Sequence, residues 1–167
     1  MDLGSGGYRE GLSILSSQHQ KKILAISSGG GHWVQLLRLR PAFEGSDITY
    51  ACVRKSYSED VPGERFVVIT DATRWDRWQL LKMLFQVAWL VFFLRPDVVI
   101  TTGAAPGYAA IRFGKWMKAR TIWIDSIANV ETMSLSGAKL ARHADLWLPQ
   151  WPHLAKPEGP RYMGAVI

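Results

Sequence analysis

Six short apolar runs alternate with longer helical patterns along this 167-residue chain, and this alternation limits the possible folds more than any other feature. The runs are continuously apolar, which is typical of strands that are covered on both faces. They are residues 22–27, 48–53, 66–70, 98–102, 121–125 and 146–148, and the helical patterns between them are 33–39, 75–94, 108–117 and 135–141. The pattern predicts an α/β fold, a Rossmann-like parallel sheet with helices on both faces.

The chain length suits one domain, which we expect over residues 21–167. Residues 1–20 are mostly polar, lack the basic start and apolar core of a secretory signal, and predict a flexible arm. Cys52 is the only cysteine, so neither an internal disulfide nor a cysteine metal cluster can form, and we expect a buried small apolar side chain there. No pair of histidines or carboxylates has metal-ligand spacing, so no metal is predicted.

Three of the predicted strands end in residues that could bind a ligand, since open parallel sheets bind ligands beyond the carboxyl ends of their strands. The first end carries Ser28, Gly29, Gly30, Gly31 and His32, the second Thr102, Gly103 and Gly107, and the third Asp125 and Ser126. Glycines let backbone N–H groups approach a ligand, and a helix N-terminus favours anions. We therefore expect the three ends to face one crevice that binds substrate, with a phosphate at the first.

The first loop differs from the common nucleotide motifs. It lacks the Gly-Lys-Ser/Thr ending of a Walker A loop and the spacing of G-x-G-x-x-G, which weakens the ATPase and NAD-enzyme interpretations. Where an NAD site would place an acidic residue, the chain has Arg54 and Lys55. These cations could bind a ribose phosphate, so an NADP-dependent reductase remains a minor alternative.

His32 stands at the first turn of a predicted helix, where the helix dipole disfavours its protonated form. A neutral imidazole there could accept a proton, which suits a general base. The alternative is a structural histidine that only bonds a neighbouring loop, and the residues alone do not separate the two.

Residues Leu80–Leu94 are apolar except for Lys82 and Gln86, and at about 22 Å the segment is too short to cross a bilayer. Arginines and tryptophans flank it, as at a headgroup boundary, and the net charge of +6 favours an anionic surface. Burial between the sheet and another layer or chain is the alternative. The predicted membrane contacts are Trp75, Trp78, Leu81, Phe85, Trp89 and Phe92. The cations are scattered without an aromatic platform, so no nucleic-acid partner is expected.

The chain has eight tryptophans, a residue that favours boundaries with one wet edge. We expect six of them at boundaries with lipid, ligand or protein and two, Trp116 and Trp123, in the core; the six are Trp33, Trp75, Trp78, Trp89, Trp147 and Trp151. A Pro/Gly-rich stretch then leads into the apolar run Tyr162–Ile167, which is either an edge strand or the start of a crossover.

Four blocks, SSGGGHWVQLLRL, RPDVVITTGAAPG, WIDSIANVETMSLSGAKLARHADLWLPQWPHL and YMGAVI, resemble the PssD-type exopolysaccharide proteins and their eukaryotic relative, asparagine-linked glycosylation protein fourteen, over residues 21–167. The resemblance implies the N-terminal half of a split GT-B glycosyltransferase. A separate small protein, equivalent to the C-terminal half, would bind the nucleotide sugar as co-substrate, with no further cofactor. This chain would hold that partner on the cytoplasmic face of the inner membrane, as a peripheral or monotopic protein, and would present a polyprenyl-diphosphate-linked saccharide acceptor.

The resemblance also implies roles for particular residues. His32 would be the catalytic base, and a surface made of Trp151, Tyr162, Met163, Val166 and Ile167 would dock the partner. The family tends to have Glu-Ser where this chain has Asp125-Ser126, and an arginine where it has Asn129, so acceptor contacts there would differ. A non-catalytic membrane scaffold for the partner enzyme is the alternative function.

Overall fold

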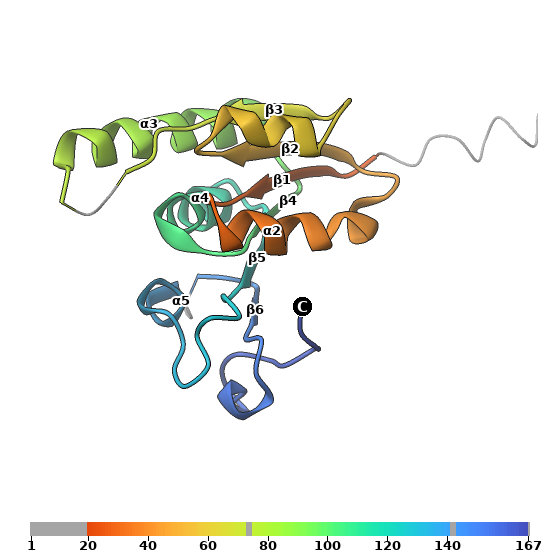
Figure 1. The fold of residues 1–167 in the computed structure, drawn as a ribbon, viewed down its shortest axis with the longest axis vertical. Helices are drawn as coiled ribbons and strands as arrows, with labels where there is room; N and C mark the ends of the chain where they lie inside the picture. The colour runs from red at the N-terminus through yellow and green to blue at the C-terminus, as the bar shows by residue number, and fades with distance from the viewer. Residues whose placement is uncertain (1–19, 73–74, 141–142, 167) are drawn as a thin grey trace, which may run out of the picture.

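All six apolar runs form strands of one parallel sheet in the computed structural model, which describes residues 20–72, 75–140 and 143–166. The strands are β1 (Lys22–Ile26), β2 (Asp47–Cys52), β3 (Arg65–Val68), β4 (Val98–Thr101), β5 (Arg120–Ile124) and β6 (Leu146–Leu148). Their order across the sheet is β3-β2-β1-β4-β5-β6 (Figure 1). The predicted Rossmann-like fold is therefore confirmed. The predicted arm lies outside the described residues except for residue 20.

Helices cover both faces of the sheet, and each face has its own apolar core. The helices are α2 (Gly31–Arg38), α3 (Arg77–Leu94), α4 (Ala104–Trp116) and α5 (Leu135–Leu140), with short 3₁₀ turns η2 (Arg40–Phe43), η3 (Lys55–Asp60) and η4 (Pro152–Leu154). One core joins the sheet to buried side chains of α3, α4 and α5, such as Met83, Ile111 and Leu140. The other contains Trp33 and Leu36 of α2 together with Phe43.

The order of the strands reverses at β1, which pairs with β2 on one side and with β4 on the other. The chain leaves β1 toward one edge of the sheet and returns to β4 before it continues toward the other edge. In such sheets the gap beyond the carboxyl ends of the two central strands is the usual ligand site. Both glycine loops begin there, because one follows β1 and the other follows β4.

Three tryptophans test the predicted division between boundary and core. Trp123 is fully buried, as predicted. Trp33 is only 1% exposed, so its placement at a ligand boundary is wrong; its ring stacks on Tyr57, and its Nε1 donates to Asp60 at 2.8 Å. Trp116 is 82% exposed, so its placement in the core is also wrong. The chain thus presents more indole on the α3–α4 side than the sequence suggested.

The end of the chain lies beyond β6, at the opposite end of the sheet from β3 and α3 (Figure 1). The N–H of Arg161 donates to the carbonyl of Trp147 at 2.9 Å, which holds the returning segment against β6. Residues 162–166 form no strand, so the edge-strand interpretation of the last apolar run is wrong.

Candidate functional site

His32 joins the two glycine loops through a pair of hydrogen bonds. Its Nδ1 lies 2.7 Å from the carbonyl oxygen of Thr102, and the Thr102 hydroxyl donates to the carbonyl of His32 at 2.6 Å. Gly103 lies against the imidazole, because a Cβ built at this glycine would be 2.9 Å from Cε1 of His32. The structure thus brings the first two predicted strand ends together at the point where the strand order reverses.

The bond to Thr102 determines which nitrogen of His32 carries the proton. A carbonyl oxygen only accepts hydrogen bonds, so Nδ1 must be the donor. In the neutral ring Nε2 is then unprotonated and has a free lone pair. Among the described residues none bonds Nε2, and the side chain is only half-buried. The arrangement is one in which a fixed imidazole can take a proton from a bound group.

The three glycines of the first loop differ in why the fold would need them. Gly30 has a φ of 67°, in the left-handed region that side chains disfavour, and its N–H donates to the hydroxyl of Tyr57 at 3.0 Å. Gly29 and Gly31 lie outside that region; a Cβ at Gly31 would touch nothing within 4 Å, and one at Gly29 would make only ordinary contacts. The fold therefore does not require glycine at these two positions, whereas a ligand that approaches the backbone would.

The segment after β2 folds back over the first loop and brings a cation to it. A Cβ at Gly29 would lie 3.5 Å from the Tyr57 hydroxyl and 3.6 Å from Nε of Arg54. The sequence suggested Arg54 only as a ligand of a ribose phosphate, at the spacing of dinucleotide enzymes. The fold places its charge beside the backbone amides of the loop, where it favours an anion of any kind.

Two side chains hold the first loop through the carbonyl of Ser28. The carbonyl of Ser28 accepts from the Ser27 hydroxyl at 2.9 Å and from Sγ of Cys52 at 3.3 Å. Cys52 is fully buried, as predicted, and burial raises the pKa of its thiol. The protonated, enclosed sulfur is a packing group rather than a nucleophile.

Asp125, at the end of β5, shapes the loop that follows it. The carboxylate is 2% exposed; Oδ1 accepts from the N–H of Ser126 and from Nδ2 of Asn129, both at 2.9 Å, and Oδ2 accepts from the N–H of Ser134 at 2.9 Å. The predicted direct contact of Asp125 with substrate does not fit this geometry, because the carboxylate is buried and its oxygens accept three bonds within the chain. The half-buried Ser126 remains a candidate contact at this strand end.

Gly107 lies inside α4 and not in the second loop as predicted, since α4 begins at Ala104. A Cβ at this position would lie 2.1 Å from Oγ1 of Thr101. Glycine here lets the helix approach β4 closely, which is a packing role. Thr102 and Gly103, both buried, are the residues of the second loop that meet His32.

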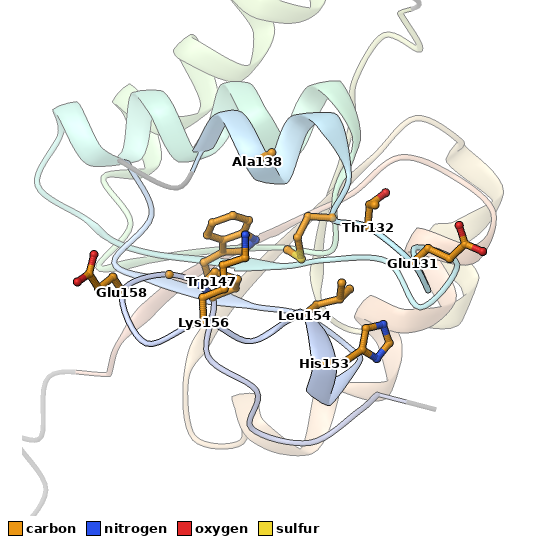
Figure 2. Close-up of a pocket in the computed structure, with 11 residues that line it drawn as sticks. Glu131, Thr132, Ala138, Trp147, His153, Leu154, Lys156 and Glu158 are labelled. Atoms are coloured by element: carbon orange, nitrogen blue, oxygen red, sulfur yellow. The ribbon is translucent and has the colours of Figure 1, made fainter.

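A cavity of about 560 Å³ lies away from the glycine loops, at the β6 end of the sheet (Figure 2). Trp147 forms its floor beneath α5, and η4 closes one side (Figure 2). Two bonds hold η4 to the 127–130 loop: Nε1 of Trp151 donates to Ile127 at 2.9 Å, and Nε2 of His153 lies 2.6 Å from the carbonyl of Val130. In the sequence, the one signal of this cavity is the Pro/Gly-rich stretch that forms its rim, and that stretch alone does not predict a cavity.

The predicted membrane contacts share an exposed position on or just before α3. All six are more than half exposed: Trp75, Trp78, Leu81, Phe85, Trp89 and Phe92. The opposite face of α3 buries Met83, Val87 and Val91 against the sheet. The alternative prediction, that this helix is buried between the sheet and another layer, is therefore wrong within the chain. α3 has 18 residues with a mean hydropathy of 1.2, so length and composition alone also allow a membrane span, in contrast to the shorter segment predicted.

Of the predicted partner surface, two residues are exposed and two are half-buried among those that the structure describes. Met163 is 71% exposed and Tyr162 39%, and Trp151 is half-buried. Val166 is also half-buried, and its N–H donates to Oε1 of Gln150 at 2.6 Å. Ile167 lies outside the described residues.

Solved structures show where this fold occurs. MurG from Acinetobacter baumannii superposes with a TM-score of 0.65 at 13% identity, over 81% of this chain but 43% of MurG. A UDP-N-acetylglucosamine 2-epimerase from Rickettsia bellii superposes with a TM-score of 0.61 at 12% identity, over 81% of this chain and 40% of the epimerase. At such low identity the likeness shows the fold alone. In both cases this chain matches less than half of the larger protein.

Sequence comparisons are more specific. A subunit of UDP-N-acetylglucosamine transferase, alg14 of Schizosaccharomyces pombe, is 30% identical over 88% of this chain and 84% of its own length. The subunit of the same name from Yarrowia lipolytica is 30% identical over 92% of this chain and 73% of its own length. The profile of the family described as oligosaccharide biosynthesis protein Alg14 like matches residues 3–166. This chain therefore belongs to the Alg14-like family.

Proposed function

We propose that this chain is the acceptor-side subunit of a two-chain glycosyltransferase that uses a nucleotide sugar, with UDP-N-acetylglucosamine as the donor suggested by its relatives. The observation that carries the proposal is the junction of His32 with Thr102 at the point where the strand order reverses. Family membership favours this function over an NADP-dependent reductase. The chain would present a polyprenyl-diphosphate-linked saccharide, and a small GT-B C-terminal-half protein would bind the donor.

In the transfer step, Nε2 of His32 takes the proton from a hydroxyl of the acceptor saccharide. The hydroxyl oxygen forms a bond to the anomeric carbon of the donor sugar. The carbon–oxygen bond to the nucleoside diphosphate breaks, and the diphosphate leaves with the electron pair. The hydrogen bond from Nδ1 to Thr102 holds the imidazole in the required tautomer throughout.

The first loop would hold the diphosphate of the acceptor lipid. Its support is the open space at Gly31, where α2 begins, and the Arg54 guanidinium beside Gly29. Backbone amides and a guanidinium are groups that bind phosphate oxygens well. Ser28 and Ser126 would add hydroxyl contacts at the same edge of the sheet.

Two further parts of the proposal concern location and assembly. The exposed face of α3 would lie on the cytoplasmic surface of a membrane, so that a lipid-linked acceptor reaches the glycine loops. The segment around Tyr162 and Met163 would dock the donor-binding partner. Their exposure supports both roles.

The test is His32→Ala in the reconstituted two-chain complex, with transfer of labelled sugar to a lipid-linked acceptor as the readout. We expect turnover to fall by about 10²- to 10⁴-fold, the usual contribution of a general base. His143→Ala is the matched control, because His143 contacts Arg112 on the α4–α5 side instead of the loops, and it should retain turnover. Normal turnover of the His32 variant would favour the scaffold function instead.

A further inference from the structure

A groove runs between α3 and α4 on the outer surface of the molecule. It holds about 240 Å³ and is lined only by apolar and aromatic side chains, among them Ala88, Trp89 and Phe92 of α3 and Phe113, Trp116 and Met117 at the end of α4. A second cavity of about 340 Å³ lies on the other side of α3, against β3. Phe85 and Trp89 line both, so they form a ridge between two apolar hollows.

The walls of the groove are unusually exposed for side chains of their kind. Trp116 is 82% exposed, and Trp89 and Phe92 are each more than half exposed. A continuous apolar surface of this sort marks a contact with lipid or protein rather than with water. Two of the aromatic rings in this wall, those of Phe85 and Trp89, stack on each other with centroids 6.1 Å apart.

The charges at the end of the groove are positive. The guanidinium of Arg95 lies 6.0 Å from the centroid of the Phe92 ring, and the exposed Lys118 directly follows Met117. Lys115 is paired with Asp145, so its charge is already balanced. Arg95 and Lys118 therefore offer two cations beside an apolar groove, which is the complement of an anionic headgroup attached to a hydrocarbon chain.

The position of the groove distinguishes two lipids that could fill it: the lipid-linked acceptor and a phospholipid of the membrane. Gly103 precedes the start of α4, whereas Trp116 is its last residue, so the groove lies at the far end of a 13-residue helix, about 20 Å from the second loop. A lipid whose diphosphate binds at the glycine loops could not place that same group at Arg95 and Lys118. A phospholipid of the surrounding membrane can.

We infer that the groove between α3 and α4 binds one acyl chain of an anionic phospholipid, whose headgroup contacts Arg95 and Lys118. This inference rests on the proposed membrane contact of α3 and adds a defined lipid site to it. Such a site would fix the depth and rotation of the domain on the bilayer, which flat contact by exposed tryptophans does not.

The experiment is calorimetric titration of the full chain with lysophosphatidylglycerols of increasing chain length, each below its critical micelle concentration. We expect one lipid per chain. The association constant should rise about fourfold for each added methylene and then stop rising when the groove is full. Partitioning onto an open apolar surface would lack both the single stoichiometry and the plateau, and that outcome would overturn the inference.

Two variants locate the site. Ala88→Trp fills the groove and should weaken binding by at least about tenfold, because several buried methylenes lose their place. Val34→Trp adds the same bulk to an exposed position of α2, on the other face of the sheet, and should leave binding unchanged. Circular dichroism checks that both variants fold. Equal loss in both, or no loss in Ala88→Trp, would contradict the site.

The headgroup contact has its own test. Lys118→Gln should weaken binding of lysophosphatidylglycerol but not of lysophosphatidylcholine, whose headgroup has no net charge. Flotation with anionic vesicles runs in parallel. If the chain floats but shows no saturable lysolipid binding, the lipid site in the groove is wrong and the membrane contact of α3 stands. If the chain does not float, the proposed membrane contact of α3 is itself wrong. A concentration-dependent dimer that Ala88→Trp disrupts would show that a second copy occupies the groove and would overturn the lipid site.

Discussion

At the scale of residues, the site depends on which atoms meet across the two central strands. In the His32–Thr102 pair, Nδ1–H of the imidazole is a donor to the carbonyl oxygen of the buried Thr102. A buried acceptor without a donor costs about 1–3 kcal/mol, which makes this bond part of the fold as well as of the site. The same pair therefore fixes both the loops and the imidazole.

Two glycine substitutions separate a ligand contact from a packing contact. Gly31→Ala has room for its methyl group, so the free energy of unfolding should stay within about 0.5 kcal/mol of the parent, while transfer activity falls because a phosphate can no longer approach. Gly107→Ala should lower the free energy of unfolding by about 1–3 kcal/mol, since its Cβ overlaps Thr101. Denaturant unfolding and a transfer assay provide the two readouts.

Gly159→Ala is the control, because its Cβ would make only an ordinary contact with Lys156 at 3.5 Å. It should change neither the free energy of unfolding nor the transfer activity. Full activity in Gly31→Ala would show that no ligand approaches the first loop closely.

Asp145 gives a pH-dependent contribution to stability. Burial works to raise the pKa of this carboxyl, but the hydrogen bonds from Lys115 and Thr121 outweigh it and hold the pKa below its ordinary value of 3.8. The folded pKa is therefore lower than the unfolded one, so the contribution is complete only well above the unfolded pKa of 3.8 and is lost as the pH falls through the folded pKa.

Asp145→Asn should lower the free energy of unfolding by about 1–3 kcal/mol at pH 7, the value of hydrogen bonds to a charged group. The difference from the parent should narrow as the pH falls below about 4, where the unfolded chain takes up the proton first, and should be smallest below the folded pKa, where the parent carboxyl is also uncharged. Denaturant unfolding across the pH range measures it. A difference that does not change with pH would show that the charge of Asp145 contributes nothing.

At the scale of elements, α3 has two unlike faces. Met83, Val87 and Val91 recur every four residues and bury one stripe, whereas the aromatic residues on the outer face are exposed. The polar Gln86 does not face outward, because its Oε1 accepts from the N–H of Thr70 at 2.8 Å and ties α3 to the end of β3. From Leu80 to the end of α3, the exposed side chains are therefore apolar except for that of Lys82.

Removal of indoles from this face should weaken membrane binding. The double variant Trp78→Ala, Trp89→Ser should reduce flotation with anionic vesicles several-fold without loss of fold, because both side chains are more than half exposed. Raised salt should also weaken vesicle binding by the parent chain, since its cations contribute to the attraction and salt screens them. Val34→Ser is the control, because it removes an exposed apolar side chain from α2 instead of α3. An equal loss of flotation in this variant would contradict a specific contact of α3.

At the scale of the whole molecule, the proposed membrane face and the proposed partner surface lie at opposite ends of the sheet (Figure 1). One end carries α3, and the other carries β6 with the segment that follows it. A partner docked beyond β6 would leave α3 free to contact lipid. The two functions should therefore be separable by mutation.

Deletion of residues 162–167 should abolish copurification with the donor-binding partner and with it transfer activity. The deleted residues that the structure describes form no strand, so the sheet should remain and vesicle flotation should be unchanged. His32→Ala is the matched comparison, because it should lose turnover but keep the partner. Copurification of the truncated chain would contradict the proposed docking surface.

Much of this fold could be predicted from local pattern. Continuously apolar runs identified six strands, because the four inner strands, covered on both faces, bury most of their side chains, and the edge strands β3 and β6 are still partly covered. The glycine loops were found for the same kind of reason, since tight turns before a helix need particular residues. The sequence also predicted the exposed α3 residues, because tryptophans and arginines at the ends of an apolar helix are a local signal.

Other features depend on contacts between distant parts of the chain. Oδ2 of Asp125 became an internal acceptor because the chain returns to it at Ser134, and Trp116 is exposed because no described element covers it at the end of α4. The bond that sets the tautomer of His32 spans 70 residues. The sequence by itself determined the six strands and the four helices to within a few residues; the tertiary structure decided which side chains meet, because partners far apart in the chain leave no mark on the local pattern.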